Sequence, residues 1–350
     1  MATLEWGDTF GHYVKDSVTA FSASPMSKKW TTQLGEDNSD RWVVGPAYGL
    51  PGAPGSCGAY VQAPNNKHAL KTLPLGSQAT RCISVWWNPG TQNTNTNGPI
   101  IAFYDSGAEQ CSVRLDGAGH IVVSRNGTTL ATSPGTISAN TWYHIQFKAT
   151  INNSTGAYEV RVNGTATGWI GAATGANTRG TGSNNSANQA CMGNVATGWR
   201  FTNYVVTDDF PGVVQGAYLH GAAAGNYQQW TPNSGDNRGA VSWTLTDDDA
   251  SFVSSTTSGN KDTFVMDDVP SPGTPAILGI QHVIYAKQDA GVQRTIRPKT
   301  RIGSTDYNGT SVNTGASYTF YTEAVSVSPA TSSAWTKAEI DGAEFGYENV

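Results

Sequence analysis

Residues 111–164 read CSVRLDGAGHIVVSRNGTTLATSPGTISANTWYHIQFKATINNSTGAYEVRVNG, and this stretch decides the fold. Its dipeptides Asp116-Gly117, Asn126-Gly127 and Asn163-Gly164 tolerate positive φ at both positions of a tight hairpin turn. Each dipeptide abuts a run of residues that favour β structure. The stretch therefore predicts consecutive antiparallel hairpins.

The segment after Trp142 alternates strictly between apolar and polar side chains. Its apolar members are Tyr143, Ile145, Phe147, Ala149 and Ile151, and its polar members are His144, Gln146, Lys148 and Thr150. A period of two indicates a strand with one buried face and one solvated face. A sheet with one apolar face must pack on another layer, so the sequence predicts a β-sandwich.

The order of these segments resembles the concanavalin A-like, or laminin-G-like, β-sandwich. The resemblance rests on Trp142-Tyr-His144 followed by a strand that ends in Val162-Asn-Gly164, and it covers about Trp6 to Asp208. It implies a jelly-roll sandwich over residues 1–210. This fold serves lectins, glucanases and adhesion modules alike, so it does not by itself imply an activity.

The composition changes near residue 211, where a stretch rich in Gly and Ala begins. Beyond it, Tyr227-Gln-Gln-Trp-Thr-Pro and the terminal Ala334-Trp-Thr-Lys-Ala-Glu resemble the C-terminal β-domain of tailed-bacteriophage structural proteins. That resemblance spans about Tyr218 to Val350 and implies a second, smaller β-sandwich over residues 211–350. We expect a strand buried on both faces at Ile277–Tyr285 and one short helix within Trp335–Glu344.

The charge, hydropathy and cysteine spacing of the sequence argue against several classes of protein. The net charge is −5 and the pI about 5.6, which argues against a nucleic-acid partner. No apolar run is long enough to span a bilayer, and the first residues lack the pattern of a secretory signal. The four cysteines are widely spaced, without metal-ligand spacing, and are expected to be free thiols. Charged residues are only 13% of the chain, which fits either extensive subunit contacts or a surface of Thr, Ser and Asn.

These observations and resemblances lead to one expected function and two alternatives. We expect a non-enzymatic phage virion structural protein, made in the host cytoplasm and displayed on the particle as a capsid decoration or tail-associated protein. Its expected partners are copies of itself in a homotrimer, other capsid or tail proteins, and host-surface polysaccharide bound weakly. The alternatives are a glycoside hydrolase of the laminarinase type and a free-standing carbohydrate-binding module.

Two groups of residues are candidates for contacts. Trp142, His144 and Tyr104 are candidate glycan contacts, because an aromatic face is the usual grip on a sugar ring; the alternative is that they belong to the core. Arg297, Lys299 and Arg301 share one strand face by parity. They are candidate contacts to another subunit or a polyanion, and the alternative is a solvated, charge-protected strand.

Four further segments of the sequence are acidic or polar. The hydrolase alternative rests on Glu339-Ile-Asp341-Gly-Ala-Glu344, which has the letters of a laminarinase motif but lies in the expected helix. The aspartates Asp247–Asp249 and Asp267-Asp268 are candidate Ca²⁺ ligands or simply solvated loop residues. The long polar segment Gly171–Asn188 is expected to be a functional or a mobile loop.

Overall fold

The computed structural model describes residues 2–10, 25–34, 43–46, 59–62, 68–96, 98–193, 198–241, 248–270, 274–289 and 291–350. It divides into two compact units, of which the first ends at Gly216 and the second runs from Ala217 to Val350. Both are built from antiparallel strands, so the expected all-β fold is confirmed. None of the described helices has the length and apolar character needed to cross a bilayer.

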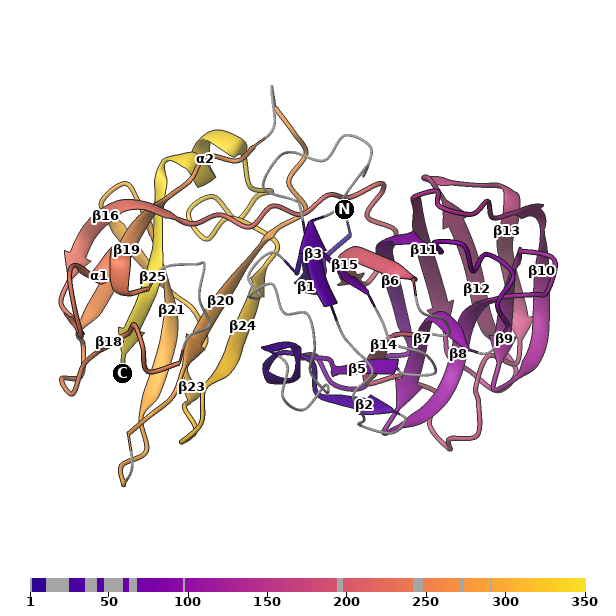
Figure 1. Cartoon of the computed structure of the whole chain (residues 1–350), viewed down its shortest axis with the longest axis horizontal. Coiled ribbons are helices and arrows are strands. Elements are labelled where there is room, and N and C mark those ends of the chain that lie inside the picture. Colours follow the sequence, from indigo (N-terminus) through magenta and orange to yellow (C-terminus); the bar gives the residue numbers. More distant parts are fainter. Residues whose placement is uncertain are drawn as a thin grey trace. The chain divides into compact units, whose positions relative to one another are not determined.

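Two sheets form the first unit (Figure 1). The larger has eight strands, in the order β13 (Thr165–Ala176), β12 (Gly156–Val162), β11 (Tyr143–Thr150), β6 (Thr80–Asn88), β15 (Arg200–Thr207), β4 (Ala59–Gln62) and β3 (Val43–Pro46), with β1 (Leu4–Asp8) also paired to β15. The smaller has seven, in the order β10 (Thr128–Thr136), β9 (His120–Arg125), β8 (Ala108–Leu115), β7 (Pro99–Asp105), β14 (Gln189–Met192), β5 (His68–Thr72) and β2 (Thr32–Leu34). A 3₁₀ turn, η2, spans Pro25–Lys28.

The inner faces of these two sheets form one core. The rings of Phe103 on β7 and Phe147 on β11 lie 5.4 Å apart, and the Tyr204 hydroxyl on β15 donates to the Cys191 carbonyl on β14 at 3.0 Å. The largest fully buried side chains are Trp6, Trp30, Trp87 and Trp199. Cys82, Cys111 and Cys191 are free and buried, as expected, whereas Cys57 lies outside the described residues.

Two of the three predicted two-residue hairpin turns are present in the structure. Asn126-Gly127 has φ values of 41° and 82°, and Asn163-Gly164 has 52° and 85°, as a two-residue turn of the favoured hand requires. At Asp116 the loop is longer: Gly119 has the positive φ of 87°, and the Asp116 carboxylate accepts from the backbone N–H of Ala118 and His120. An Asx-type turn therefore replaces the expected tight turn there.

The second unit contains a six-stranded sheet and two hairpins. The sheet has the order β16 (Gly221–Gln228), β19 (Lys261–Met266), β25 (Ala343–Asn349), β21 (Thr295–Ile302) and β22 (Thr305–Asn308), with β23 (Val312–Asn313) also paired to β21. The hairpins pair β17 (Thr231–Pro232) with β18 (Val253–Ser254), and β20 (Ile280–Ala286) with β24 (Thr319–Val325). The helices are α1 (Asn237–Ala240) and α2 (Lys337–Asp341), the latter inside the expected helical segment.

The β20–β24 hairpin packs on the apolar face of the six-stranded sheet. The His282 ring lies 5.7 Å from the Phe345 ring, and its Nε2 atom lies 3.1 Å from Thr300 Oγ1. Every residue of β20 is nevertheless half-buried. The expectation of a strand buried on both faces is therefore wrong, because β20 is one half of a two-stranded sheet.

Candidate functional site

The polar face of β11 is covered by residues 209–216, which we call the strap. Gln146 Nε2 donates to the Gly212 carbonyl at 2.9 Å, and Trp86 Nε1 donates to the Val214 carbonyl at 2.9 Å. His144 and Gln146 are completely buried as a result. The expectation that these two side chains face solvent is wrong, because a segment 66 residues away from Gln146 in the sequence lies over them.

His144 is held as a neutral side chain at this position. Its Nε2 atom lies 2.8 Å from Ser84 Oγ and 3.4 Å from the backbone nitrogen of Val214. Burial lowers its pKa to about 4. Trp142, the residue before β11, is also buried, with 7% of its surface exposed. Neither side chain presents an open surface on which a sugar would stack.

Tyr104 lies on the other sheet of the first unit, so the three candidate glycan contacts are not brought together. It packs with Leu70, Ala102 and Cys191, and its hydroxyl donates to Glu109 at 3.5 Å. Burial raises the pKa of this hydroxyl. Only 5% of Tyr104 is exposed, which makes it part of a packed face in the described structure.

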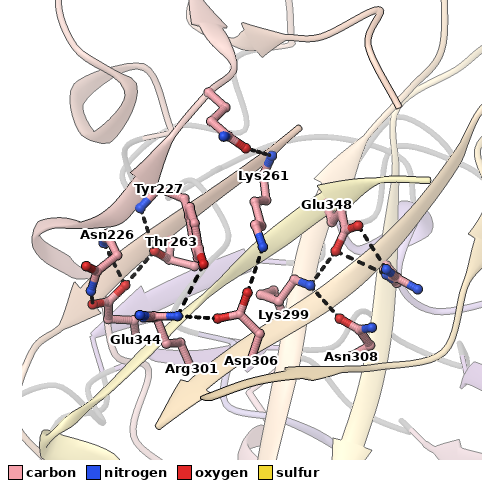
Figure 2. A network of polar contacts seen from close by, with 12 residues as sticks. Asn226, Tyr227, Lys261, Thr263, Lys299, Arg301, Asp306, Asn308, Glu344 and Glu348 are labelled. Carbon is pink, nitrogen blue, oxygen red and sulfur yellow. Dashed lines mark hydrogen bonds and ion pairs between the residues drawn. The ribbon is translucent and has the colours of Figure 1, made fainter. Parts of the chain in front are cut away.

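The basic residues of β21 belong to an ion-pair network in the second unit, shown in Figure 2. Arg297 Nη2 lies 2.8 Å from Glu348 Oε1, Lys299 also pairs with Glu348, and Arg301 Nη1 lies 2.6 Å from Asp306 Oδ1. These three cations do share a face, as parity predicts. Their charges are already compensated inside the unit, and Lys299 is buried, so the face differs from the expected basic patch.

The carboxylates of the laminarinase-like motif are separated by the fold. Glu339 on α2 accepts from Ser328, Asp341 pairs with Lys337 at 2.7 Å, and Glu344 lies on β25. Glu344 accepts from Thr263 Oγ1 at 2.5 Å and from the Asn226 N–H at 2.7 Å (Figure 2). Each carboxylate is therefore engaged in a different structural contact.

Three of the four described aspartates of the candidate Ca²⁺ segments also have partners, and the fourth, Asp268, is exposed. Asp249 pairs with Lys287, Asp248 accepts from the Tyr285 hydroxyl, and Asp267 accepts from the His220 N–H. Asp247 lies outside the described residues. Within the described part of the chain, no three His, Cys, Asp or Glu side chains are grouped so that they could hold a metal ion.

A pocket of about 250 Å³ opens at one end of the first unit. The turn between β9 and β10 forms one wall, and the segment after β13 forms the other. Its lining consists of Arg125, Asn126, Thr128, Asn177, Arg179, Gly180 and Thr181. Every lining side chain carries hydrogen-bonding groups, and four of them, Asn126, Thr128, Asn177 and Thr181, are exposed to solvent.

The second wall of the pocket is anchored on the strands below it. The buried Thr178 hydroxyl donates to the Thr150 carbonyl at 2.6 Å, and the Arg179 N–H donates to the Asn152 carbonyl at 3.1 Å. The Gly180 N–H donates at 2.8 Å to Oε1 of the completely buried Gln110. These bonds fix the wall before any ligand arrives, which lowers the entropic cost of binding.

Gly180 is required at the base of this wall. A Cβ atom at this position would lie 1.9 Å from the carbonyl oxygen of Glu109, which no side chain tolerates. Gln110 also retains an Nε2 atom with no partner among the described residues. The close approach of the loop to β8 therefore depends on a residue without a side chain.

Only partial signals for this pocket are visible in the sequence. The dipeptide Asn126-Gly127 predicts a turn, and the composition of Gly171–Asn188 predicts a long polar loop, of which Gly171–Ala176 is in fact the end of β13. Arg125 and Arg179 carried no recognisable motif. They line one pocket because the β9–β10 turn of the seven-stranded sheet lies close to the segment after β13 of the eight-stranded sheet, and periodicity alone does not specify how the two sheets pack.

Comparisons with known proteins concern the fold. No family model and no curated protein sequence matches the chain. Domain 4 of a GH43 arabinanase from Geobacillus stearothermophilus is 13% identical with a TM-score of 0.36, covering 59% of this chain and 93% of that domain. A GH131 β-glucanase catalytic domain from Podospora anserina is 11% identical with a TM-score of 0.34, covering 60% and 98%. A Trypanosoma rangeli sialidase is 12% identical with a TM-score of 0.29, and the match takes in 48% of this chain and 31% of the sialidase.

The expected function, that of a phage virion structural protein, disagrees with these comparisons. The three solved structures named above are a domain of an arabinanase, a β-glucanase catalytic domain and a sialidase, and none of the three is a bacteriophage protein. The expectation of a non-enzymatic phage virion structural protein is therefore wrong, and the carbohydrate-active alternatives agree better with the findings. The homotrimer, the other expected partners and the virion location stay predictions.

Proposed function

We propose that the first unit is a carbohydrate-binding module and that its sugar occupies the pocket between Arg125 and Arg179. The observation that carries the proposal is the lining itself: a concave, pre-anchored surface on which every side chain offers a hydrogen-bond donor or acceptor. Amide side chains such as Asn126 and Asn177 provide both, which suits neighbouring hydroxyl groups of a sugar.

The pocket size limits what is held there. A volume of about 250 Å³ is below the roughly 300–1,000 Å³ typical of pockets for drug-sized ligands. It suits one sugar unit or the end of a glycan chain. At about 0.3 kcal/mol per heavy atom, a monosaccharide of about a dozen heavy atoms would bind with a Kd on the order of 1 mM. Useful retention then requires several sites acting together.

The test is binding of the whole chain to a panel of soluble polysaccharides in affinity gel electrophoresis. We expect retardation by at least one polymer and loss of that retardation in the double variant Asn126→Gly and Thr181→Ala. Glycine at residue 126 keeps the positive φ of 41° accessible while it removes the side chain. Asn153→Ala, an exposed asparagine outside the pocket lining, is the control and should bind normally.

Two outcomes contradict the proposal. Retardation by no polymer in the panel removes its basis, and retardation that survives in the double variant places the sugar elsewhere. Release of new reducing ends from the bound polymer, measured in parallel, separates the hydrolase alternative from a binding module.

A further inference from the structure

No carboxylate among the described residues forms an ion pair with either pocket arginine, in contrast to five of the other described arginines. Neither Arg125 nor Arg179 forms an ion pair with any residue in the described ranges, and the pocket lining contains no acidic side chain. The arginines that do pair with a carboxylate are Arg81, Arg114, Arg161, Arg297 and Arg301. Two positive charges therefore line one small pocket in a chain whose net charge is −5.

The Arg179 guanidinium is oriented by the protein. Its Nη1 atom donates to the Ser183 carbonyl at 3.0 Å and to Asn185 Oδ1 at 3.3 Å. Both acceptors are neutral, so they fix the planar group without compensating its charge. Among the described residues, none accepts a hydrogen bond from the other nitrogens of this guanidinium, which leaves part of its fork for a ligand.

Two like charges that face a common space repel each other, and an anion between them removes that repulsion. The guanidinium fork matches the two oxygens of a carboxylate or sulfate, with shorter and stronger hydrogen bonds than those to a neutral hydroxyl. From this we infer that the pocket selects a sugar that carries an anionic group, either the carboxylate of a uronic or other acidic sugar or a sulfate ester. The inference rests on the proposed function and names the class of sugar.

The test uses matched pairs of polymers and the full chain in affinity electrophoresis. Polygalacturonate is compared with its fully methyl-esterified form, and dextran sulfate with dextran. We expect at least one anionic polymer to bind about tenfold or more tightly than its neutral counterpart. The binding should weaken as the salt concentration rises, because the Debye length falls from about 10 Å at 0.1 M to 3 Å at 1 M. Comparison of the two anionic arms identifies carboxylate or sulfate as the recognised group.

Variants assign the effect to the pocket. Arg125→Gln and Arg179→Gln should each reduce anionic-polymer binding about tenfold. Arg238→Gln removes the same charge from an exposed arginine of the second unit and should leave binding unchanged. Arg125→Gln alone suffices if the Arg179 variant misfolds, because the Arg125 side chain forms no hydrogen bond or ion pair with the described residues.

Three outcomes would overturn the inference that the pocket selects an anionic sugar. Equal binding to a neutral polymer and its anionic counterpart overturns it and leaves the proposed function standing. Binding to no polymer overturns both. A loss that is as large in Arg238→Gln as in the pocket variants shows attraction by the surface as a whole and also overturns it.

Discussion

The Nε2 atom of His144 lies 2.8 Å from the Oγ atom of Ser84, and both side chains are completely buried beneath the strap. The backbone N–H of Val214 also points at this nitrogen, at 3.4 Å, so Nε2 acts as an acceptor and the imidazole hydrogen resides on Nδ1. Nδ1 has no partner among the described residues. Protonation would therefore add a hydrogen where a donor already points, and the neutral form is strongly favoured.

Acidification should destabilise the first unit through His144. An unfolded histidine takes up a proton near pH 6.5, whereas folded His144, whose pKa burial lowers to about 4, does so only near that value. The contribution of His144 to the free energy of unfolding is thus fully present above pH 6.5. It is lost as the pH drops from 6.5 to 4, by about 3 kcal/mol at most. His144→Gln, which keeps an acceptor but does not titrate, should flatten part of this slope.

The measurement is urea unfolding of the whole chain from pH 7 to pH 4, with hydrogen exchange of the β6 and β11 peptides as the probe. His68, whose pKa is also lowered to about 4, adds a slope of its own, so the difference between wild type and variant is the informative quantity. If the free energy of unfolding falls equally with pH in wild type and His144→Gln, then His144 does not cause the loss of stability.

Local sequence pattern predicted strands better than it predicted surfaces. The alternation after Trp142 identified β11 and its buried face correctly, because packing of Phe147 on Phe103 requires only period two. It failed for His144 and Gln146, because what covers a polar face is set by a distant segment of the chain. The pocket escaped detection for the same reason: Arg125 ends a strand of one sheet and Arg179 follows the end of a strand of the other, so they line one pocket only once the two sheets pack together.

Substitution of Gly180 should abolish sugar binding without unfolding the protein. In Gly180→Ala the new methyl group would lie 1.9 Å from the Glu109 carbonyl, so the loop must move away from β8. The loss of the Gly180–Gln110 bond and the displaced packing should cost about 1–3 kcal/mol. Gly171→Ala is the matched control, since its methyl group would meet open space. Thermal unfolding measures the loss of stability, and affinity electrophoresis measures the loss of sugar binding. Normal sugar binding by Gly180→Ala would contradict the assigned role of this loop.

The second unit should be sensitive to acid in a lower pH range, through Glu344. Burial tends to raise the pKa of this carboxyl, but hydrogen bonds from Thr263 and Asn226 outweigh it and the net pKa lies below the usual 4.5. The stabilisation is therefore complete above pH 4.5 and is lost as the pH falls further. At pH 7, Glu344→Gln should lower the free energy of unfolding by about 1–3 kcal/mol, because one acceptor becomes a donor facing other donors.

Hydrogen exchange of the β19 and β25 peptides, followed as a function of urea concentration, measures this loss of unfolding free energy. Asp268→Asn makes the same change of charge at an exposed residue and should leave the exchange unaltered. A destabilisation of equal size in the two variants would mean that net charge, and not the hydrogen bonds of Glu344, is responsible.

The strap should open more readily when its hydrogen bond to Trp86 is removed. Trp86→Phe keeps an aromatic ring but leaves the Val214 carbonyl without its donor, at a cost of about 1 kcal/mol. This free energy corresponds to about a fivefold rise in the open population, so limited proteolysis within residues 209–216 should accelerate by about that factor. Trp335→Phe removes an equivalent bond, from Nε1 to the Val325 carbonyl at 2.9 Å in the second unit, and should leave strap cleavage unchanged. Equal acceleration in both variants would indicate a general loss of stability. No acceleration in Trp86→Phe would show that the strap is held by its other contacts, which include the Gln146–Gly212 hydrogen bond and the Arg161 guanidinium 3.8 Å from the Phe210 ring centre.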